Sequence, residues 1–197
     1  MNFLAHLHLA DNSQTSLAGN LAGDFAKGNI QDFAKPLQQG IWLHRQLDQL
    51  TDEHEISRDL IRQFPKKYSR IAPVLMDLAF DHMLARYWDE YHGDTLEVFT
   101  QRAYEELAQT PDLPEKLSKL VPVMRQQNWL LAYESRTGLN DAILGVGRRF
   151  SKPELFVGAD KVVKQMDTDI EIAFRTLYPQ LMAYSRILSR KTPDDYL

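Results

Sequence analysis

Residues 40–52, Gly-Ile-Trp-Leu-His-Arg-Gln-Leu-Asp-Gln-Leu-Thr-Asp, form the stretch on which the interpretation of the whole chain depends. If this stretch is helical, His44 and Asp48 lie one turn apart on the same face. Leu37 and Ile41 share that face, so the polar pair is expected to point into the protein interior. Because an unpaired buried charge is costly, the pair requires partners from elsewhere in the chain.

Two other segments carry the same kind of polar pair. Asn20 and Asp24 are four residues apart, as are Asp77 and Asp81, and His82 follows directly. Three separate segments therefore offer inward oxygen and imidazole ligands. We interpret them as converging on one polar site that binds a metal.

A purely structural explanation also fits the third segment. Asp77, Asp81, His82 and Arg86 could form a buried ion-pair network, although such networks contribute little net stability. The two carboxylates are one turn apart and repel each other, and a bound cation would relieve that repulsion.

Three further side chains have two interpretations each. His6 and His8 alternate with apolar residues near the start of the chain, and each could be a ligand or a packed, hydrogen-bonded core residue. Arg45 could grip a carboxylate or a phosphate in a bidentate way, or form a surface ion pair near Asp48 or Gln49.

Composition narrows the class of protein. At 197 residues with 44% hydrophobic and 25% charged residues, the chain is expected to form one soluble domain, residues 1–197. It has no cysteine, so any metal must be held by His, Asp, Glu or Asn, which favours Mn, Fe, Mg or Zn. A net charge of −4 argues against general nucleic-acid binding. The first residues lack the features of a signal peptide and no stretch is long enough to span a membrane, so we expect a cytoplasmic protein without a membrane partner.

Apolar periodicity predicts an all-α fold, a compact multi-helix domain rather than a simple four-helix bundle. Residues 1–10 fit either a short strand or a first helical turn. The remaining helices are expected at residues 16–25, 36–51, 53–64, 73–91, 96–107, 114–133 with an interruption near Pro122, 139–150, and 153–189 with a kink or division at Pro179.

Four motifs resemble the acyl carrier protein phosphodiesterases, also called acyl carrier protein hydrolases, and the resemblance extends over nearly the whole chain. The motifs are Met-Asn-Phe-Leu-Ala-His-Leu-His-Leu-Ala at 1–10, Gly-Asn-Leu-Ala-Gly-Asp-Phe at 19–25, His-Arg-Gln-Leu-Asp at 44–48 followed by Leu-Thr-Asp at 50–52, and Asp81-His82 with Arg86.

The resemblance implies a function and a cofactor. Members of this family remove 4′-phosphopantetheine from holo-acyl carrier protein, a carrier of fatty acid biosynthesis, and leave the apo-protein. They depend on a divalent cation, usually Mn²⁺, and are regarded as divergent relatives of the all-helical HD-domain phosphohydrolases. The resemblance therefore implies an HD-domain-like fold. One departure matters, because the adjacent pair here is Asp81-His82, the reverse of the HD order, so that superfamily's ligand set cannot be copied.

The predicted site combines the polar residues on helix faces that are expected to point inward with this family resemblance. The expected metal ligands are His44, Asp81 and His82, with Asp24, Asp48 and Asp77 as second choices. The expected catalytic set is Asp24, His44, Arg45, Asp48, Asp81, His82 and Arg86.

Two other functions remain open at this point. The chain could be a metal-dependent phosphohydrolase of a small nucleotide, since fold and metal do not determine the substrate. It could also be a non-catalytic helical interaction module with a buried salt network.

Charge also suggests where a partner could bind. Acyl carrier proteins are strongly acidic, so a cognate enzyme should offer a basic docking surface. The sequence has two basic clusters, which could equally be ordinary solvated surface: Lys66, Lys67 and Arg70, and Arg148, Arg149 and Lys152.

Overall fold

The structure is a computed structural model that describes residues 1–193 and residue 196. Within those residues every regular element is a helix, which confirms the predicted all-α class. The α-helices are α1 (Phe3–Asn12), α2 (Leu17–Ala22), α3 (Lys35–Glu53), α4 (Glu55–Gln63), α5 (Ala72–Arg86), α6 (Leu96–Gln109), α7 (Glu115–Gln126), α8 (Trp129–Ala132), α9 (Arg136–Gly147), α10 (Ala159–Gln165) and α11 (Asp167–Ser189). Short 3₁₀ turns add η1 (Lys66–Tyr68), η2 (Trp88–Glu90) and η3 (Pro153–Phe156).

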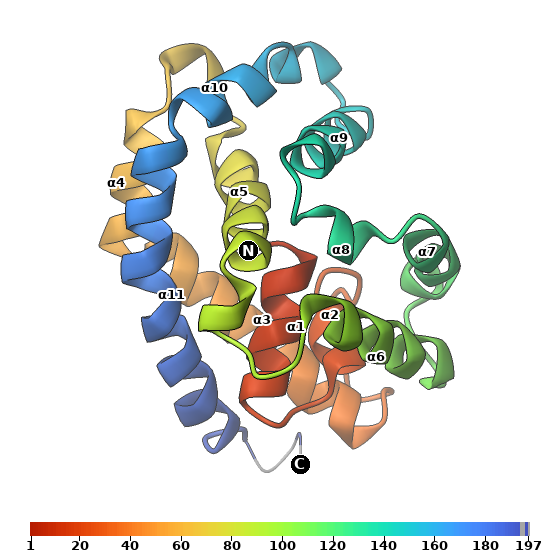
Figure 1. Cartoon of the computed structure of the whole chain (residues 1–197). Helices are drawn as coiled ribbons and strands as arrows, with labels where there is room; N and C mark the ends of the chain where they lie inside the picture. The colour runs from red at the N-terminus through yellow and green to blue at the C-terminus, as the bar shows by residue number, and fades with distance from the viewer. Residues whose placement is uncertain (194–195, 197) are drawn as a thin grey trace.

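Helix α1 is the central element, and α2, α3, α5 and α11 pack around it (Figure 1). Every residue from Leu4 to Ala10 is buried. Of the two conformations that the sequence allowed for residues 1–10, the structure has the helix. A helix that is apolar on all sides is stable where neighbouring elements cover every face. His6 and His8 are thereby buried as well, and both need hydrogen-bond partners.

Helices α2 and α3 approach each other closely at two glycines. A Cβ atom at Gly40 would lie 2.5 Å from the backbone nitrogen of Asn20, and one at Gly19 would lie 2.8 Å from the carbonyl oxygen of Pro36. Because neither glycine has a side chain, the two backbones come within contact distance. This approach brings the polar residues of α2 opposite the buried face of α3.

Two prolines lie inside helices without dividing them. Helix α7 continues through Pro122 and α11 continues through Pro179. Proline removes one backbone hydrogen bond in the preceding turn, but both prolines are exposed, so the freed carbonyl can face water. The predicted interruption near Pro122 and division at Pro179 are therefore absent. The break after α7 falls instead at Asn128, whose φ is 49°.

The last long helix starts later than predicted. The sequence predicted a helix from residues 152–153 onward, whereas the structure has η3, then α10, then α11 from Asp167. Gly158 separates η3 from α10 with a φ of 78°, a conformation that ends regular helix and favours glycine.

The buried apolar side chains of the described residues form one cluster that extends from Met1 to Leu181. None of the described helices combines the length and the hydropathy that crossing a membrane would require.

Candidate functional site

Three side chains from two helices meet near the N-terminal part of the molecule, and we name His6, His44 and Asp48 the His–Asp cluster. One carboxylate oxygen of Asp48 lies 3.0 Å from Nε2 of His6, and the other lies 3.0 Å from Nε2 of His44. The possible ligand atoms all lie within 4.8 Å of one another. In the described part of the chain, no other three His, Cys, Asp or Glu side chains meet in this way.

The local structure explains how the cluster forms. His44 and Asp48 are one turn apart on α3, as their spacing predicted. The imidazole of His6 comes from α1 and stacks on that of His44, with ring centroids 4.0 Å apart and planes inclined by 26°. Gly23 leaves room for this stack, because a Cβ atom there would lie 2.2 Å from Cγ of His44.

Further carboxylates surround the His–Asp cluster. Oδ1 of Asp24 lies 3.7 Å from Nε2 of His44, so Asp24 faces the same site as His44, as the sequence predicted. The amino group of Met1 lies 3.4 Å from Oδ1 of Asp48 and 3.2 Å from Oδ1 of Asp77. Burial raises the pKa of Asp24, and the neighbouring His44 acts in the opposite direction. Although 36% of its side-chain surface is exposed, Asp24 is therefore a better proton acceptor than an ordinary aspartate.

Burial controls the charge of the cluster itself. Burial and the adjacent His44 together lower the pKa of His6 to about 3, against the raising effect of Asp48, so His6 is neutral at pH 7. Burial alone would raise the pKa of Asp48, but hydrogen bonds with His44 and His6 hold it well below its usual range. A neutral imidazole at His6 and an ionised carboxylate at Asp48 are the protonation states that a divalent cation requires of such ligands.

Asn20 supplies a test of whether a cation fits. Its Oδ1 lies 3.1 Å from Nδ1 of His6, while Nε2 of the same ring faces Asp48. A neutral imidazole carries one proton, so it cannot donate to both oxygens, and one lone pair is left facing an acceptor. Either a rotated Asn20 amide or a cation bound at Nε2 removes this conflict. The donor set of two imidazole nitrogens and a carboxylate fits a divalent cation. Asn20 contacts Nδ1 of His6, on the opposite side of the ring from the cluster, and fixes the orientation of that ring.

Asp81 has a different role from the one predicted for it. Its two oxygens accept hydrogen bonds from the backbone nitrogens of Leu4 at 2.8 Å and Ala5 at 3.0 Å. These donors belong to the first turn of α1, whose own N-cap residue, Asn2, makes no capping hydrogen bond. Asp81 therefore caps α1 from outside, and we correct its assignment from metal ligand to helix cap.

His82 and Arg86 also lie outside the cluster. Nδ1 of His82 is 2.6 Å from the carbonyl oxygen of Tyr133, and Arg86 forms an ion pair with Asp167 at 3.2 Å. The predicted network of these residues with Asp77 and Asp81 does not form in the described chain, because neighbouring positions on α5 face different helices. Neither side chain is retained in the proposed site.

Arg45 supports the connection between α2 and α3. Its guanidinium donates hydrogen bonds to the carbonyl oxygens of Ala26 at 2.9 Å and Gly28 at 3.3 Å. Among the described residues Arg45 does not form the surface ion pair that the sequence suggested, and its role in gripping a phosphate stays a prediction.

The two histidines of α1 differ in role. His8 packs in the core, with Nδ1 2.8 Å from the hydroxyl of Tyr178 and Nε2 3.2 Å from the carbonyl oxygen of Tyr91. His6 belongs to the cluster, although the sequence left it open and the predicted ligand set omitted it. The sequence signal that could have identified His6 is its position in an apolar run, because a buried histidine needs a polar partner.

The sequence of this chain is similar to those of one family of known proteins. The family model described as "Acyl carrier protein phosphodiesterase" matches residues 1–181. The chain is 34% identical over 185 residues to the Acyl carrier protein phosphodiesterase of Yersinia pestis, which covers 92% of this chain and 96% of the relative. The protein of that name from Photorhabdus laumondii is also 34% identical, with 92% of this chain and 93% of the relative covered. The protein of that name from Escherichia coli O6:H1 is 34% identical as well, with 92% of this chain and 96% of the relative covered. No solved structure matches the chain significantly.

Proposed function

This chain belongs to the acyl carrier protein phosphodiesterase family, and we propose that it hydrolyses the phosphodiester bond between 4′-phosphopantetheine and the serine of holo-acyl carrier protein. The products are apo-acyl carrier protein and 4′-phosphopantetheine, so the enzyme acts on a carrier of fatty acid biosynthesis. The observation that supports this proposal best is the convergence of His6, His44 and Asp48 from two helices.

The reaction needs a nucleophilic water, neutralisation of phosphoryl charge and a proton for the leaving group. The water oxygen forms a bond to phosphorus, the bond from phosphorus to the serine oxygen breaks, and the serine oxygen takes up a proton. Asp24, which lies 3.7 Å from His44 and has a raised pKa, orients the water and accepts its proton.

We assign a divalent cation to the His–Asp cluster, with Mn²⁺ as the expected ion. When bound, such a cation lowers the pKa of water and neutralises charge on a phosphoryl oxygen. His6, His44 and Asp48 are the residues that would hold it, and Asn20 holds the His6 ring in place.

Mass spectrometry of holo-acyl carrier protein tests the proposal directly. With Mn²⁺ the carrier protein should lose the mass of 4′-phosphopantetheine, and with a chelator it should not. His44→Asn and Asp48→Asn should lower turnover at least a hundredfold while the helical circular dichroism stays unchanged, because ligands to a metal serve the reaction rather than the fold.

His54→Asn is the matched control. His54 caps α4 with its side chain and lies outside the cluster, and asparagine is itself a good N-cap. Its turnover should equal that of the parent. Near-parental turnover of His44→Asn would contradict the metal assignment, and turnover of nucleotides with none of holo-acyl carrier protein would contradict the substrate.

A further inference from the structure

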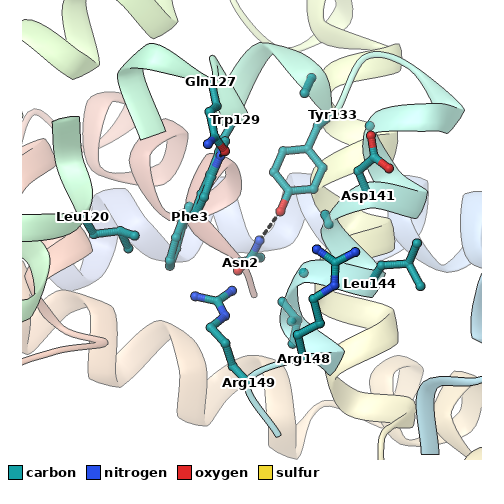
Figure 2. Close-up of a pocket in the computed structure, with 15 residues that line it drawn as sticks. Asn2, Phe3, Leu120, Gln127, Trp129, Tyr133, Asp141, Leu144, Arg148 and Arg149 are labelled. Carbon is teal, nitrogen blue, oxygen red and sulfur yellow. Dashed lines mark hydrogen bonds between the residues drawn. The ribbon is translucent and has the colours of Figure 1, made fainter. Parts of the chain in front are cut away.

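A cavity of about 720 Å³ lies between the start of α1, the end of α7, α8 and α9 (Figure 2). Its volume falls in the range of small-molecule sites. Three aromatic residues, Phe3, Trp129 and Tyr133, line it and form a largely apolar wall. The proposed chemistry at the His–Asp cluster does not account for this cavity.

Two arginines give the cavity a positive charge. Arg148 and Arg149 line it, and in Figure 2 both guanidinium groups point into it. Neither guanidinium group makes a hydrogen bond or an ion pair within the described residues, although Asp141 lies on the same wall. Two guanidinium groups without a protein partner attract an anion, and their planar forks match the oxygens of a phosphate.

The polar groups on the remaining wall are amides and aromatic donors. The side-chain amide of Asn2 donates a hydrogen bond to the hydroxyl of Tyr133, drawn as a dashed line in Figure 2. Nε1 of Trp129 donates to Oε1 of Gln127 at 2.8 Å. A ligand that carries amide groups along an otherwise apolar chain is complementary to a wall of this kind.

The cavity adjoins the His–Asp cluster through the first turn of α1. Asn2 and Phe3 line the cavity and follow Met1, whose amino group lies 3.4 Å from Asp48. The ring of Phe3 also packs on that of Phe25, with centroids 6.2 Å apart, and Phe25 is the neighbour of Asp24. A ligand in the cavity therefore lies against the same turn that borders the proposed reaction site.

We propose that this cavity binds the 4′-phosphopantetheine moiety, with its amide-bearing chain along the aromatic wall. Its phosphate, the group that is cleaved in the proposed reaction, lies at the side formed by the first turn of α1, between the His–Asp cluster and the cationic anchor of Arg148 and Arg149. The identity of this ligand rests on the proposed function. The geometry of the cavity and its two arginines without a partner in the described chain do not depend on that proposed function.

Gly145 allows the cavity to be filled without disturbing the fold. It lines the cavity, and a Cβ atom there would meet nothing within 4 Å. Gly145→Phe should therefore occupy the ligand's space. Thr137→Phe adds a bulky side chain in the same helix at an exposed position that does not line the cavity, so it is the matched control.

Isothermal titration with free 4′-phosphopantetheine and with pantetheine, which lacks the phosphate, tests binding. Gly145→Phe should weaken binding of both compounds at least tenfold. The double variant in which glutamine replaces both Arg148 and Arg149 should bind 4′-phosphopantetheine at least tenfold more weakly. Its affinity for pantetheine should be unchanged. Thr137→Phe should bind both like the parent. Because both arginines are exposed, the double variant tests the proposal even if Gly145→Phe fails to fold.

Kinetics with holo-acyl carrier protein separate failure of this inference from failure of the proposed function. Gly145→Phe should raise the KM for the carrier protein at least tenfold. If the parent hydrolyses holo-acyl carrier protein but Gly145→Phe keeps the parental KM and affinity, the cavity assignment is overturned. If the parent binds 4′-phosphopantetheine in the cavity without hydrolysing the carrier protein, the proposed function fails and the cavity assignment stands.

Discussion

Two carboxylates, the half-buried Asp48 and the buried Asp81, show how the partners of a single residue decide its role. Asp48 contacts imidazoles, and hydrogen bonds with them keep it ionised despite its burial. Within the described residues Asp81 accepts hydrogen bonds from the backbone N–H groups of Leu4 and Ala5 in α1, and burial raises its pKa to about 7. The same residue type thus serves a candidate metal site in one place and a helix terminus in the other.

The raised pKa of Asp81 makes stability depend on pH in a defined direction. Its pKa is about 7 in the folded state against 3.8 for an ordinary aspartate, so the folded state binds more protons between these pH values. The stability that Asp81 contributes is therefore present below about pH 4 and is lost as the pH rises through 7. Asp81→Asn does not titrate. Relative to this variant, the parent should lose up to about 4 kcal/mol of unfolding free energy between pH 4 and pH 8.

Urea denaturation at several pH values measures this difference. Asp89→Asn, which changes an exposed carboxylate, should follow the parent at every pH. A difference between the parent and Asp81→Asn that stays constant with pH would show that Asp81 is not protonated in the folded protein.

At the scale of elements, the contact between α2 and α3 positions the site. Gly19 and Gly40 bring the two backbones together, and α2 thereby carries Asn20 to His6 and leads the chain on to Asp24 beside His44. A small residue on each helix is thus a condition for a polar site that neither helix forms alone.

Gly40→Ala tests this contact. The added Cβ would lie 2.5 Å from backbone atoms of Gly19 and Asn20, which cannot rotate away as a side chain can. Although alanine favours helix, we expect the variant to lose about 1–3 kcal/mol of stability in urea denaturation. Gly145→Ala is the control, because its Cβ meets nothing within 4 Å and should gain up to about 1 kcal/mol. A Gly40→Ala protein as stable as Gly145→Ala would mean that the two helices can separate freely.

At the scale of the whole molecule, the segments that carry Lys66, Lys67 and Lys152 lie next to each other. Turn η1, with Lys66 and Lys67, contacts η3, which directly follows Lys152. The hydroxyl of Tyr68 donates to the carbonyl oxygen of Val157 at 2.9 Å and ties these segments to one another. Lys66, Lys67 and Lys152 thereby form a basic surface on a chain with a net charge of −4.

This basic surface is expected to guide the acidic carrier protein. Reversing the charge of Lys66 and Lys67 to glutamate should raise the KM for holo-acyl carrier protein about tenfold at low salt, with kcat unchanged, because opposed charges mainly accelerate association. The effect should vanish at high salt. The matched control reverses Arg190 and Lys191, which are exposed near the end of α11. An equal KM for both double variants would place docking elsewhere.

The sequence by itself determined the features that depend on near neighbours in the chain. Apolar periodicity predicted an all-α protein, and the helix expected at residues 36–51 is α3, Lys35–Glu53. The spacing of His44 and Asp48 predicted a pair on one face, and the two side chains are in contact at 3.0 Å. The family followed from short motifs that extend along the chain. A predicted relation to the HD-domain phosphohydrolases stays a prediction.

Only the tertiary structure decided which of the inward polar groups meet. Spacing placed Asp81 and His44 on buried faces alike, but helix packing directs Asp81 to the first turn of α1 and brings His6 to His44 instead. The cavity beside α1 is likewise built from segments more than a hundred residues apart in the sequence. The physical reason is that helical periodicity reports which side of a helix is buried, whereas the partner on that side depends on how separate helices cross.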